Sequence, residues 1–306
     1  MVWQAVVEQP SGLGESPFWH PEEQRLYWLD IPGRQLLRTR PGTGLVDRWD
    51  LPQDPGCVAP VAGASGALVL ALRDGIYRAR AWGGALEQLA PALHDVATTR
   101  FNDGKCDALG RLWVGTIYEP RDAARAALYC LDMQAAAQPA LQQMATGVTT
   151  ANGLAWSPDA AHLYWADTPS HTVSRRAFDL AGATLGPPQV FQAFAPKPPG
   201  WQSGQPGYGG RPDGAAVDVQ GNYYCALFEG ARILKIAPDG TVLAEIPVPA
   251  QCPTMPCFGG PGLKTLFVTT ARDKRPEAEL QRWPQSGCVF AMPVEVPGLP
   301  VQFFQE

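Results

Sequence analysis

Four oxygen-bearing side chains stand at a regular place along this chain of 306 residues. A short apolar segment repeats through the sequence, and ten or eleven residues before four of its copies lie Glu15, Asn102, Asn152 and Asp213. Two carboxylates and two amide carbonyls form a hard ligand set, which suits Ca²⁺, Mg²⁺, Mn²⁺ or Fe²⁺. Zn²⁺ is less natural here, because histidine and cysteine dominate most zinc sites. The pattern predicts a divalent-cation site if the fold brings the four residues together.

Each of these residues also has a purely local explanation. Asn102, Asn152 and Asp213 precede Asp-Gly or Gly, which is typical of turns. Glu15, after Gly14, fits a solvated loop carboxylate. Four independent turns, however, have no reason to coincide with the period of a repeat. We therefore favour a shared ligand site over four separate turns.

The repeated unit is an apolar strand, a tight turn of four to six residues and a second apolar strand. Its six second strands begin at or near Leu26, Leu68, Leu112, Leu163, Tyr223 and Leu266. The spacings are 42, 44, 51, 60 and 43 residues. Roughly 40 to 50 residues is the period of a four-stranded propeller blade. The sequence thus predicts an all-β, six-bladed β-propeller, with residues 1–306 as a single domain.

The elements of this propeller follow from local composition. Aromatic and β-branched residues fill the strands, and Gly, Pro and Asp separate them. A strand from Trp3 to Val7 should complete the last blade, and Asp122 to Ala127 is the one helix candidate. Positions just before each innermost strand cluster at one end of the central channel of a propeller. This fold would therefore gather the four oxygen-bearing residues, and the metal site would lie at that end.

The 60-residue spacing contains a surplus segment between Phe194 and Gly210 that is rich in proline and glycine. Long loops in compact domains are often functional. We expect it to cover a site, although a surface excursion without a role explains it equally simply.

Composition excludes several classes of protein. The net charge is −5 and the sequence holds no cluster of lysine and arginine, so neither nucleic acid nor an anionic membrane is an expected partner. The start of the chain lacks the pattern of a signal peptide, and no apolar run reaches the ~18 residues of a membrane-spanning helix. The seven cysteines lack CxxC spacing. We expect a cytoplasmic protein with reduced, buried thiols.

Several segments carry a family resemblance. They are Leu13-Gly14-Glu15-Ser16-Pro17, Arg100-Phe101-Asn102-Asp103-Gly104-Lys105, Asn152-Gly153-Leu154-Ala155-Trp156-Ser157-Pro158-Asp159 and Gly210-Arg211-Pro212-Asp213-Gly214. With them the sequence resembles the gluconolactonase family, also called the regucalcin or senescence-marker-protein family. The resemblance implies a six-bladed propeller, in agreement with the repeat count.

The resemblance also implies roles for individual residues. Glu15, Asn152 and Asp213 would hold one divalent cation, with Ca²⁺ favoured by ligand type and Zn²⁺, Mg²⁺, Mn²⁺ or Fe²⁺ as alternatives. Arg100 and Asn102 would contact a sugar lactone. Glu119, which follows the Gly115-Thr116 dipeptide, would orient the substrate.

The implied reaction is metal-dependent hydrolysis of an aldonolactone to its aldonic acid. The cation would polarise the lactone carbonyl and activate water, and Asp213 would act as general base. Arg100 would donate charged hydrogen bonds to substrate oxygens. The expected partner is a small-molecule sugar lactone, and the protein would be a monomer or a weak homodimer.

Other functions remain open from sequence alone. The same scaffold could serve as a non-catalytic calcium-binding or regulatory propeller, or hydrolyse another lactone or a phosphotriester. A nucleophilic-serine lactonase is disfavoured because no Gly-x-Ser-x-Gly motif is present. Receptor-type YWTD repeats match two of six units only, at Leu26 to Asp30 and Leu163 to Asp167. Asp103 and Lys105 favour a surface ion pair.

Overall fold

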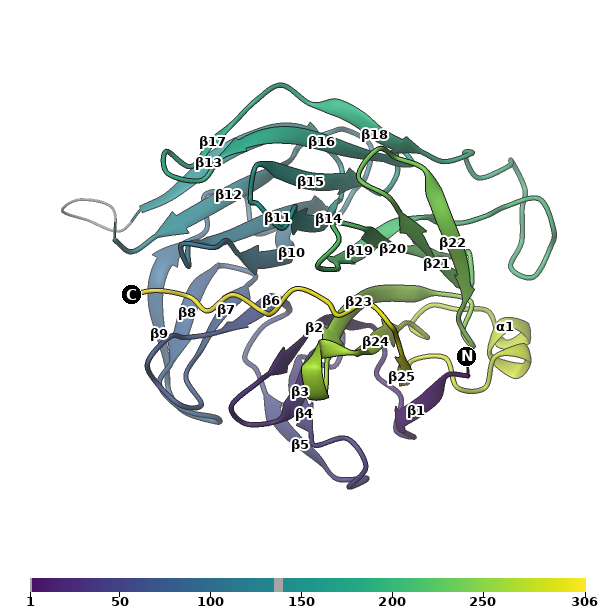
Figure 1. Cartoon of the computed structure of the whole chain (residues 1–306), viewed down its shortest axis with the longest axis horizontal. Helices are drawn as coiled ribbons and strands as arrows, with labels where there is room; N and C mark the ends of the chain where they lie inside the picture. The colour runs from purple at the N-terminus through teal and green to yellow at the C-terminus, as the bar shows by residue number, and fades with distance from the viewer. Residues whose placement is uncertain (1, 135–139) are drawn as a thin grey trace.

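The chain forms six β-sheets arranged around a central channel (Figure 1). A computed structural model describes residues 2–134 and 140–306. The strands of each sheet pair antiparallel, mostly with the strands that precede and follow them in the chain, and their order runs from the channel outward. The predicted all-β, six-bladed propeller is thus confirmed.

The six blades have the following strands, from the channel outward. Blade 1 holds β2 (Gly14–His20), β3 (Arg25–Asp30), β4 (Gln35–Thr39) and β5 (Val46–Asp50). Blade 2 holds β6 (Pro55–Pro60), β7 (Leu68–Leu72), β8 (Gly75–Ala79) and β9 (Leu86–Pro91). Blade 3 holds β10 (Thr99–Cys106), β11 (Leu112–Tyr118), β12 (Ala126–Asp132) and β13 (Ala140–Val148).

The second half of the ring repeats this order. Blade 4 holds β14 (Ala151–Trp156), β15 (His162–Asp167) and β16 (Thr172–Asp179), and both β17 (Thr184–Leu185) and β18 (Gln189–Ala193) pair with β16. Blade 5 holds β19 (Arg211–Val217), β20 (Tyr223–Phe228), β21 (Arg232–Ile236) and β22 (Val242–Pro247). Blade 6 holds β23 (Pro253–Gly259), β24 (Thr265–Thr270), β25 (Val289–Pro293) and β1 (Gln4–Val7).

Strand β1 closes the ring. It pairs antiparallel with β25, so the first strand of the chain is the outermost strand of the last blade. The strand predicted at the start of the chain is confirmed in this role. The pairing joins the two ends of the propeller by backbone hydrogen bonds, which leaves blade 6 with four strands like most of its neighbours.

The hydrophobic core lies between blades. Each of six clusters of buried apolar side chains joins two adjacent blades; for example, Trp113 and Leu128 of blade 3 pack with Leu163 and Trp165 of blade 4. The six residues that mark the sequence repeat are all 0% exposed. They are buried because both faces of each sheet are covered by neighbouring blades, and this explains the nearly continuous apolar character of the second strands.

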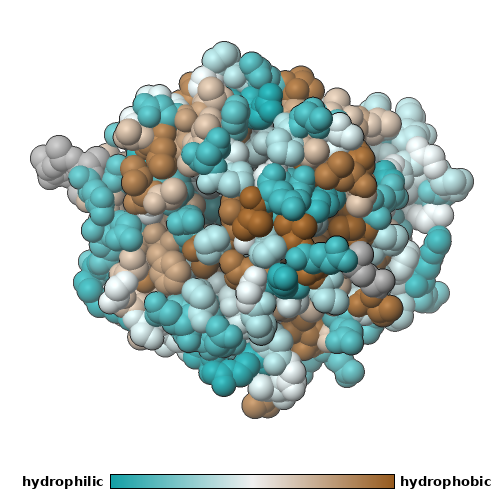
Figure 2. Space-filling view, viewed as in Figure 1, coloured by the Kyte–Doolittle hydropathy of each residue, from teal (hydrophilic) through white to brown (hydrophobic). Residues whose placement is uncertain are grey.

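The C-terminal segment, residues 294–306, crosses one mouth of the channel (Figure 1). Its backbone amides at positions 298, 299, 304 and 305 donate to the carbonyls of Leu263, Val217, Pro60 and Gly110. These acceptors follow or end the innermost strands of blades 6, 5, 2 and 3. The segment therefore covers the end of the channel where the innermost strands finish. Figure 2 shows this face, on which apolar patches alternate with polar side chains.

One expected element is wrong. The helix candidate from Asp122 to Ala127 is instead a turn followed by the start of β12, where Ala126 and Ala127 pair with Val148 and Thr146. Sheet pairing here overrides the intrinsic helix preference of alanine. Among the described residues the α-helical element is α1 (Glu277–Arg282), with a 3₁₀ turn, η1, at Pro261–Leu263.

None of the helices described between residues 2 and 306 is long and apolar enough to cross a membrane.

Candidate functional site

The four oxygen-bearing residues gather at the mouth opposite the C-terminal segment. Each lies near the start of an innermost strand, in blades 1, 3, 4 and 5, and each side chain is at least nine-tenths buried; they are Glu15, Asn102, Asn152 and Asp213. Because the C-terminal segment contacts the other ends of these strands, the two features occupy opposite ends of the channel.

A β-bulge shapes each of these strands. The pairing register shifts between Glu15 and Phe18 in blade 1, and equivalent shifts occur in the innermost strands of the other blades. Glu15 and Asn152 are the last paired residues before their shifts, whereas Asn102 and Asp213 are the first unpaired ones. In all four blades the residue lies four positions before the one that pairs with the repeat marker. That marker follows seven residues later in blades 1 and 4 but six in blades 3 and 5, so the turn length explains the sequence spacings of eleven and ten. Bulges re-aim side chains, here toward the channel mouth.

A hydrogen-bonded chain orients Asn152. Its Oδ1 accepts from Asn102 Nδ2 at 2.9 Å, and its Nδ2 donates to Thr168 Oγ1 at 2.8 Å. Thr168 in turn donates to Pro212 O at 2.8 Å, next to Asp213. With Nδ2 engaged, the free lone pair of Asn152 is on Oδ1. Thr168 carries no motif that sequence reasoning could have used, since its role depends on contact between blades.

The carboxyl groups of Glu15 and Asp213 are buried, and the charges of Arg100 and Arg211 act on them from beyond ion-pair distance. In the described part of the chain, no lysine, arginine or histidine nitrogen forms an ion pair with either. Burial raises the pKa of Glu15 well above its usual range, and the charge of Asp213 adds to the effect. Burial likewise raises the pKa of Asp213 to about 8. Two such carboxylates at one place favour a cation between them.

An amide oxygen would have to complete any metal site here. Within residues 2–134 and 140–306, no group of three or more His, Cys, Asp or Glu side chains is placed to hold a metal ion. The donors available are the oxygens of Glu15, Asp213 and Asn152. All are hard ligands of the kind that Ca²⁺ and Mg²⁺ prefer.

Arg100 and Glu119 lie beside this group. Arg100 Nη1 donates to Asn102 Oδ1 at 3.0 Å and to Phe101 O at 2.9 Å. Its Nε is 3.7 Å from Glu119 Oε1, and burial lowers the pKa of the guanidinium. Glu119 also forms an ion pair with Arg73 at 2.9 Å. The structure therefore brings all of the substrate-contact residues expected from the sequence to the same mouth.

In blades 2 and 6, a thiol (Cys57) and a thioether (Met255) lie at the positions of the sequence repeat that correspond to those of the four oxygen-bearing residues. Cys57 and Met255 are buried, and a Cβ at Gly104 would come within 2.5 Å of Cys57 Sγ. A Cβ at Gly214 would come within 2.5 Å of Met255. Blades 2 and 6 thus close the channel by packing rather than by polar ligands. All seven cysteines are free and buried, as expected.

The long loop from Phe194 to Gly210 leads into the site, because it ends where β19 begins, two residues before Asp213. Lys197 Nζ lies 3.0 Å from both carboxylate oxygens of Glu229. Tyr208 OH and His171 Nε2 are 2.8 Å apart. These contacts anchor both ends of the loop to blades 4 and 5, so it forms a fixed wall beside the mouth.

The expectation of a surface ion pair between Asp103 and Lys105 is wrong. Asp103 is 6% exposed, and its carboxylate bonds to the amide of Leu154 at 2.8 Å. Lys105 Nζ instead donates to Leu154 O at 2.8 Å and Ala215 O at 2.5 Å. The Asn-Asp-Gly run that suggests a surface turn is a bulge inside β10, which directs both side chains inward.

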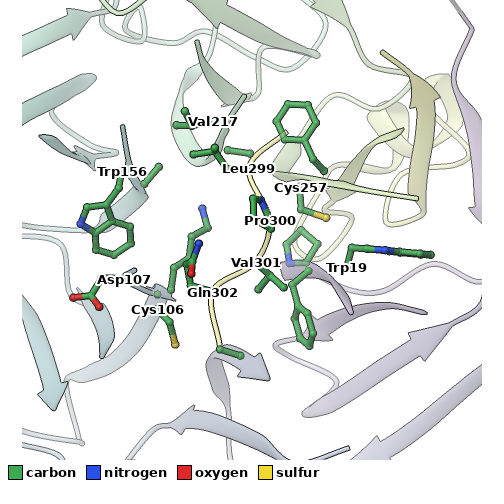
Figure 3. A pocket seen from close by; sticks show the side chains of 18 of the residues that line it. Trp19, Cys106, Asp107, Trp156, Val217, Cys257, Leu299, Pro300, Val301 and Gln302 are labelled. Atoms are coloured by element: carbon green, nitrogen blue, oxygen red, sulfur yellow. The ribbon is translucent and has the colours of Figure 1, made fainter. Parts of the chain in front are cut away.

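A cavity of about 190 Å³ occupies the channel behind the C-terminal segment (Figure 3). Trp19, Trp156, Cys257 and Val301 line it, and most of its lining is apolar. Lys105 also borders this cavity. Its lining runs along the innermost strands from Ser16 and Met255 to the C-terminal segment, so the cavity extends through the channel toward the mouth that holds Glu15 and Asp213.

Known proteins resemble this chain over nearly its whole length. A 6-deoxy-6-sulfogluconolactonase from Pseudomonas putida is 44% identical over 96% of this chain and 95% of its own. A pentonolactonase from Haloferax volcanii is 32% identical over 96% and 95%, respectively. A crystal structure described as a calcium-binding protein, regucalcin, from Agrobacterium tumefaciens superposes with a TM-score of 0.89 over 100% of this chain and 98% of that one, at 24% identity.

The SMP-30/Gluconolactonase/LRE-like region matches residues 13–272, which include every oxygen-bearing residue of the mouth. Together with the 44% identity to the sulfogluconolactonase, this match shows that the chain belongs to the SMP-30/gluconolactonase/LRE-like family.

Proposed function

We propose that this protein hydrolyses a sugar lactone to its aldonic acid, using a divalent cation held by Glu15, Asn152 and Asp213. The observation that carries the proposal is the pair of buried carboxyl groups that form no ion pair within the described part of the chain, joined by an oriented amide oxygen. The chain is a lactone hydrolase by family, and two of its relatives are named for the lactones on which they act.

The donor set fits a hard divalent cation. A buried carboxylate without a paired charge destabilises the folded protein. A cation bound between two such carboxylates compensates their charge and removes this cost. Ca²⁺ is favoured by an all-oxygen set of this kind. When bound, the cation supplies a Lewis acid that polarises the lactone carbonyl and lowers the pKa of water.

Asp213 is the general base in this proposal. Burial raises the pKa of its carboxyl group to about 8, and a neighbouring cation favours the ionised form that a base requires. An oxygen of Asp213 accepts the proton of the attacking water as the C–O bond forms. The same proton passes to the ring oxygen when the lactone C–O bond breaks, and the aldonic acid leaves.

Arg100 and Asn102 position the sugar. Arg100 uses Nη1 to hold Asn102 and places Nε toward Glu119, and in the described part of the chain no hydrogen bond engages its Nη2. Nη2 can therefore donate to a lactone oxygen. Glu119 fixes the guanidinium and offers an acceptor for a sugar hydroxyl.

The lactone to test first carries an anionic group. The relative at 44% identity is named for a sulfonated gluconolactone. Beside the mouth, the cations Lys197, Arg211 and Arg275 all contact Glu229 within about 3 Å, and Arg275 also pairs with Glu279. These three cations can attract an anionic substituent on the sugar, although Glu229, Glu279 and Asp213 share their charge.

Hydrolysis of a lactone panel, followed with a pH indicator, tests the proposal. The panel contains 6-deoxy-6-sulfoglucono-, glucono-, galactono-, xylono- and arabinonolactone. The protein is stripped with a chelator and then supplied with each divalent cation. Cation-dependent opening of at least one lactone is expected. Hydrolysis that persists unchanged after stripping would refute the metal-dependent mechanism, and binding of a cation without any turnover would favour a non-catalytic propeller.

A further inference from the structure

Lys105 joins three blades inside the channel. It comes from β10 in blade 3, and its Nζ donates to Leu154 O in blade 4 and to Ala215 O in blade 5. Leu154 lies two residues after Asn152, and Ala215 lies two residues after Asp213. One ammonium group thus holds the two strands that carry two of the three proposed metal ligands.

The bonds of Lys105 fall at interruptions of the sheet pairing: Leu154 lies inside one register shift, and Ala215 is the first paired residue after another. Register shifts interrupt the ladder between Asn152 and Ala155 and between Pro212 and Ala215. Backbone groups in such bulges need other partners when they are buried. Lys105 takes Leu154 O, and Asp103 of the same strand takes Leu154 N at 2.8 Å. Two side chains of strand β10 therefore hydrogen-bond to both backbone polar groups of Leu154.

Lys105 also carries a positive charge into the channel. Its Nζ bonds only to backbone carbonyls, and no carboxylate of the described residues forms an ion pair with it. The negative charges of Asp103 and Glu15 nonetheless act on it. Lys105 also borders the apolar cavity that extends along the channel.

We propose that Lys105 is a positioning residue for the metal centre: by binding Leu154 O and Ala215 O, it sets the separation of Asn152 and Asp213. This inference rests on the metal site of the proposed function. It assigns to Lys105 no contact with substrate or cation. The positive charge of Lys105 repels a divalent cation at the mouth and so weakens its binding. The carbonyl bonds of Lys105 position the ligands and so strengthen binding, which means that the two effects oppose each other.

Because the two effects oppose each other, the direction of the change in Ca²⁺ affinity distinguishes between them. In Lys105→Met the repulsion disappears, which alone would strengthen binding of a divalent cation. Loss of the two carbonyl bonds frees β14 and β19, which weakens binding. Residues that orient metal ligands typically change metal affinity about 10- to 100-fold. We expect Ca²⁺ to bind about 10- to 100-fold more weakly to Lys105→Met, measured by titration calorimetry on chelator-stripped protein.

Lys274→Met is the matched control. The Lys274 side chain is 91% exposed, so the substitution removes the same charge from the surface rather than from the channel. It should bind Ca²⁺ like the wild type. Affinity in Lys105→Met that equals or exceeds the wild-type value would overturn the inference while leaving the proposed function intact. A wild-type protein that binds neither Ca²⁺ nor another divalent cation would instead refute the metal site itself.

A second variant keeps the test valid if Lys105→Met fails to fold. Lys105→Ala leaves room for ethylammonium, which restores both the charge and the N–H donors. Ethylammonium chloride should raise the thermal midpoint of the stripped Lys105→Ala protein and recover its Ca²⁺ affinity. Tetramethylammonium chloride, with the same charge and no N–H, should do neither. Equal effects of the two salts would contradict the role of the carbonyl bonds.

Discussion

The carboxylates of Glu15 and Asp213 approach from blades 1 and 5 closely enough that the charge of Asp213 raises the pKa of Glu15. Both groups are buried, and neither has an ion-pair partner in the described part of the chain. The mouth is therefore built at a cost in stability that a bound cation would offset.

Asp213→Asn should separate stability from activity. Burial raises the pKa of Asp213 to about 8, so folding of the stripped protein near neutral pH must protonate this carboxyl at a cost in stability. Asn removes that cost, and the stripped variant should unfold at a higher denaturant concentration than the stripped wild type. Ca²⁺ binding should weaken, and kcat should fall by about 100-fold or more because the general base is lost. Denaturant titration, calorimetry and lactone hydrolysis measure the three effects.

Asp218→Asn is a suitable control in the same blade. Asp218 is fully buried, but it accepts hydrogen bonds from Asn222 and pairs with Lys235 at 3.4 Å. Its replacement should destabilise the protein. If the stripped Asp213→Asn protein is destabilised as much as Asp218→Asn, the claim that the buried Asp213 carboxyl group costs stability is wrong.

Arg100→Ala should act mainly on substrate binding. The substitution removes the proposed donor to the lactone and also the bond to Asn102 Oδ1. A charged hydrogen bond contributes about 1.5–3 kcal/mol, so KM should rise about 10-fold or more. Arg73→Ala is the comparison, since Arg73 contacts Glu119 and Asp54 but makes no bond to Asn102. If both variants shift KM equally, Arg100 has no special role in binding substrate.

Deletion of residues 196–207 should change which lactone is preferred. The deletion removes the wall that includes Lys197 but retains Tyr208, which contacts His171, and Arg211, which contacts Glu229. The propeller should fold because the deleted residues belong to no strand. Relative kcat/KM across the lactone panel is the measurement. Lys197→Met keeps the loop length and isolates the contribution of the charge, and an unchanged profile in both variants would leave the loop without a role in specificity.

His94 should make stability fall in mild acid. Burial lowers the pKa of this imidazole, whose Nε2 lies 3.2 Å from Arg73 O and whose ring packs on Phe101. The folded state thus prefers the neutral ring, so its stability is fully present above the unfolded pKa of about 6.5 and decreases as the pH falls below it. Urea denaturation at pH 7.5 and 5.5 should show a smaller loss for His94→Gln than for the wild type. A loss of equal size in both would show that another group controls this range.

The number of blades and the residues at the channel mouth were predictable because both follow the sequence repeat. Leu26, Leu112 and Leu266 recur at the blade period and are all fully buried, since equivalent positions meet equivalent surroundings. Glu15 and Asp213 could be aligned by the same period. The closing strand at Gln4–Val7 was predictable because a ring of four-stranded blades needs one more outer strand.

Contacts between blades were not predictable from local patterns. Thr168 accepts a hydrogen bond from Asn152 within blade 4 and donates to Pro212 O in blade 5, and no neighbouring residue in the sequence marks it. Lys105 looked like part of a surface turn because Asp103-Gly104 is a common turn pair, yet a bulge places it inside a strand. The helix α1 is too short, at six residues, to produce a clear periodic pattern.

The pairing of β1 with β25 has a consequence for how the chain reaches its native state. Residues near the beginning of the chain must wait, unpaired, until the chain has been synthesised past Pro293. Contacts so distant in sequence form slowly, because a long loop must close before they contribute. The mouth that gathers Glu15 and Asp213 exists only in the closed ring. Lactone-binding ability should therefore emerge only after β25 has been synthesised, even though blades 2 to 5 can form earlier.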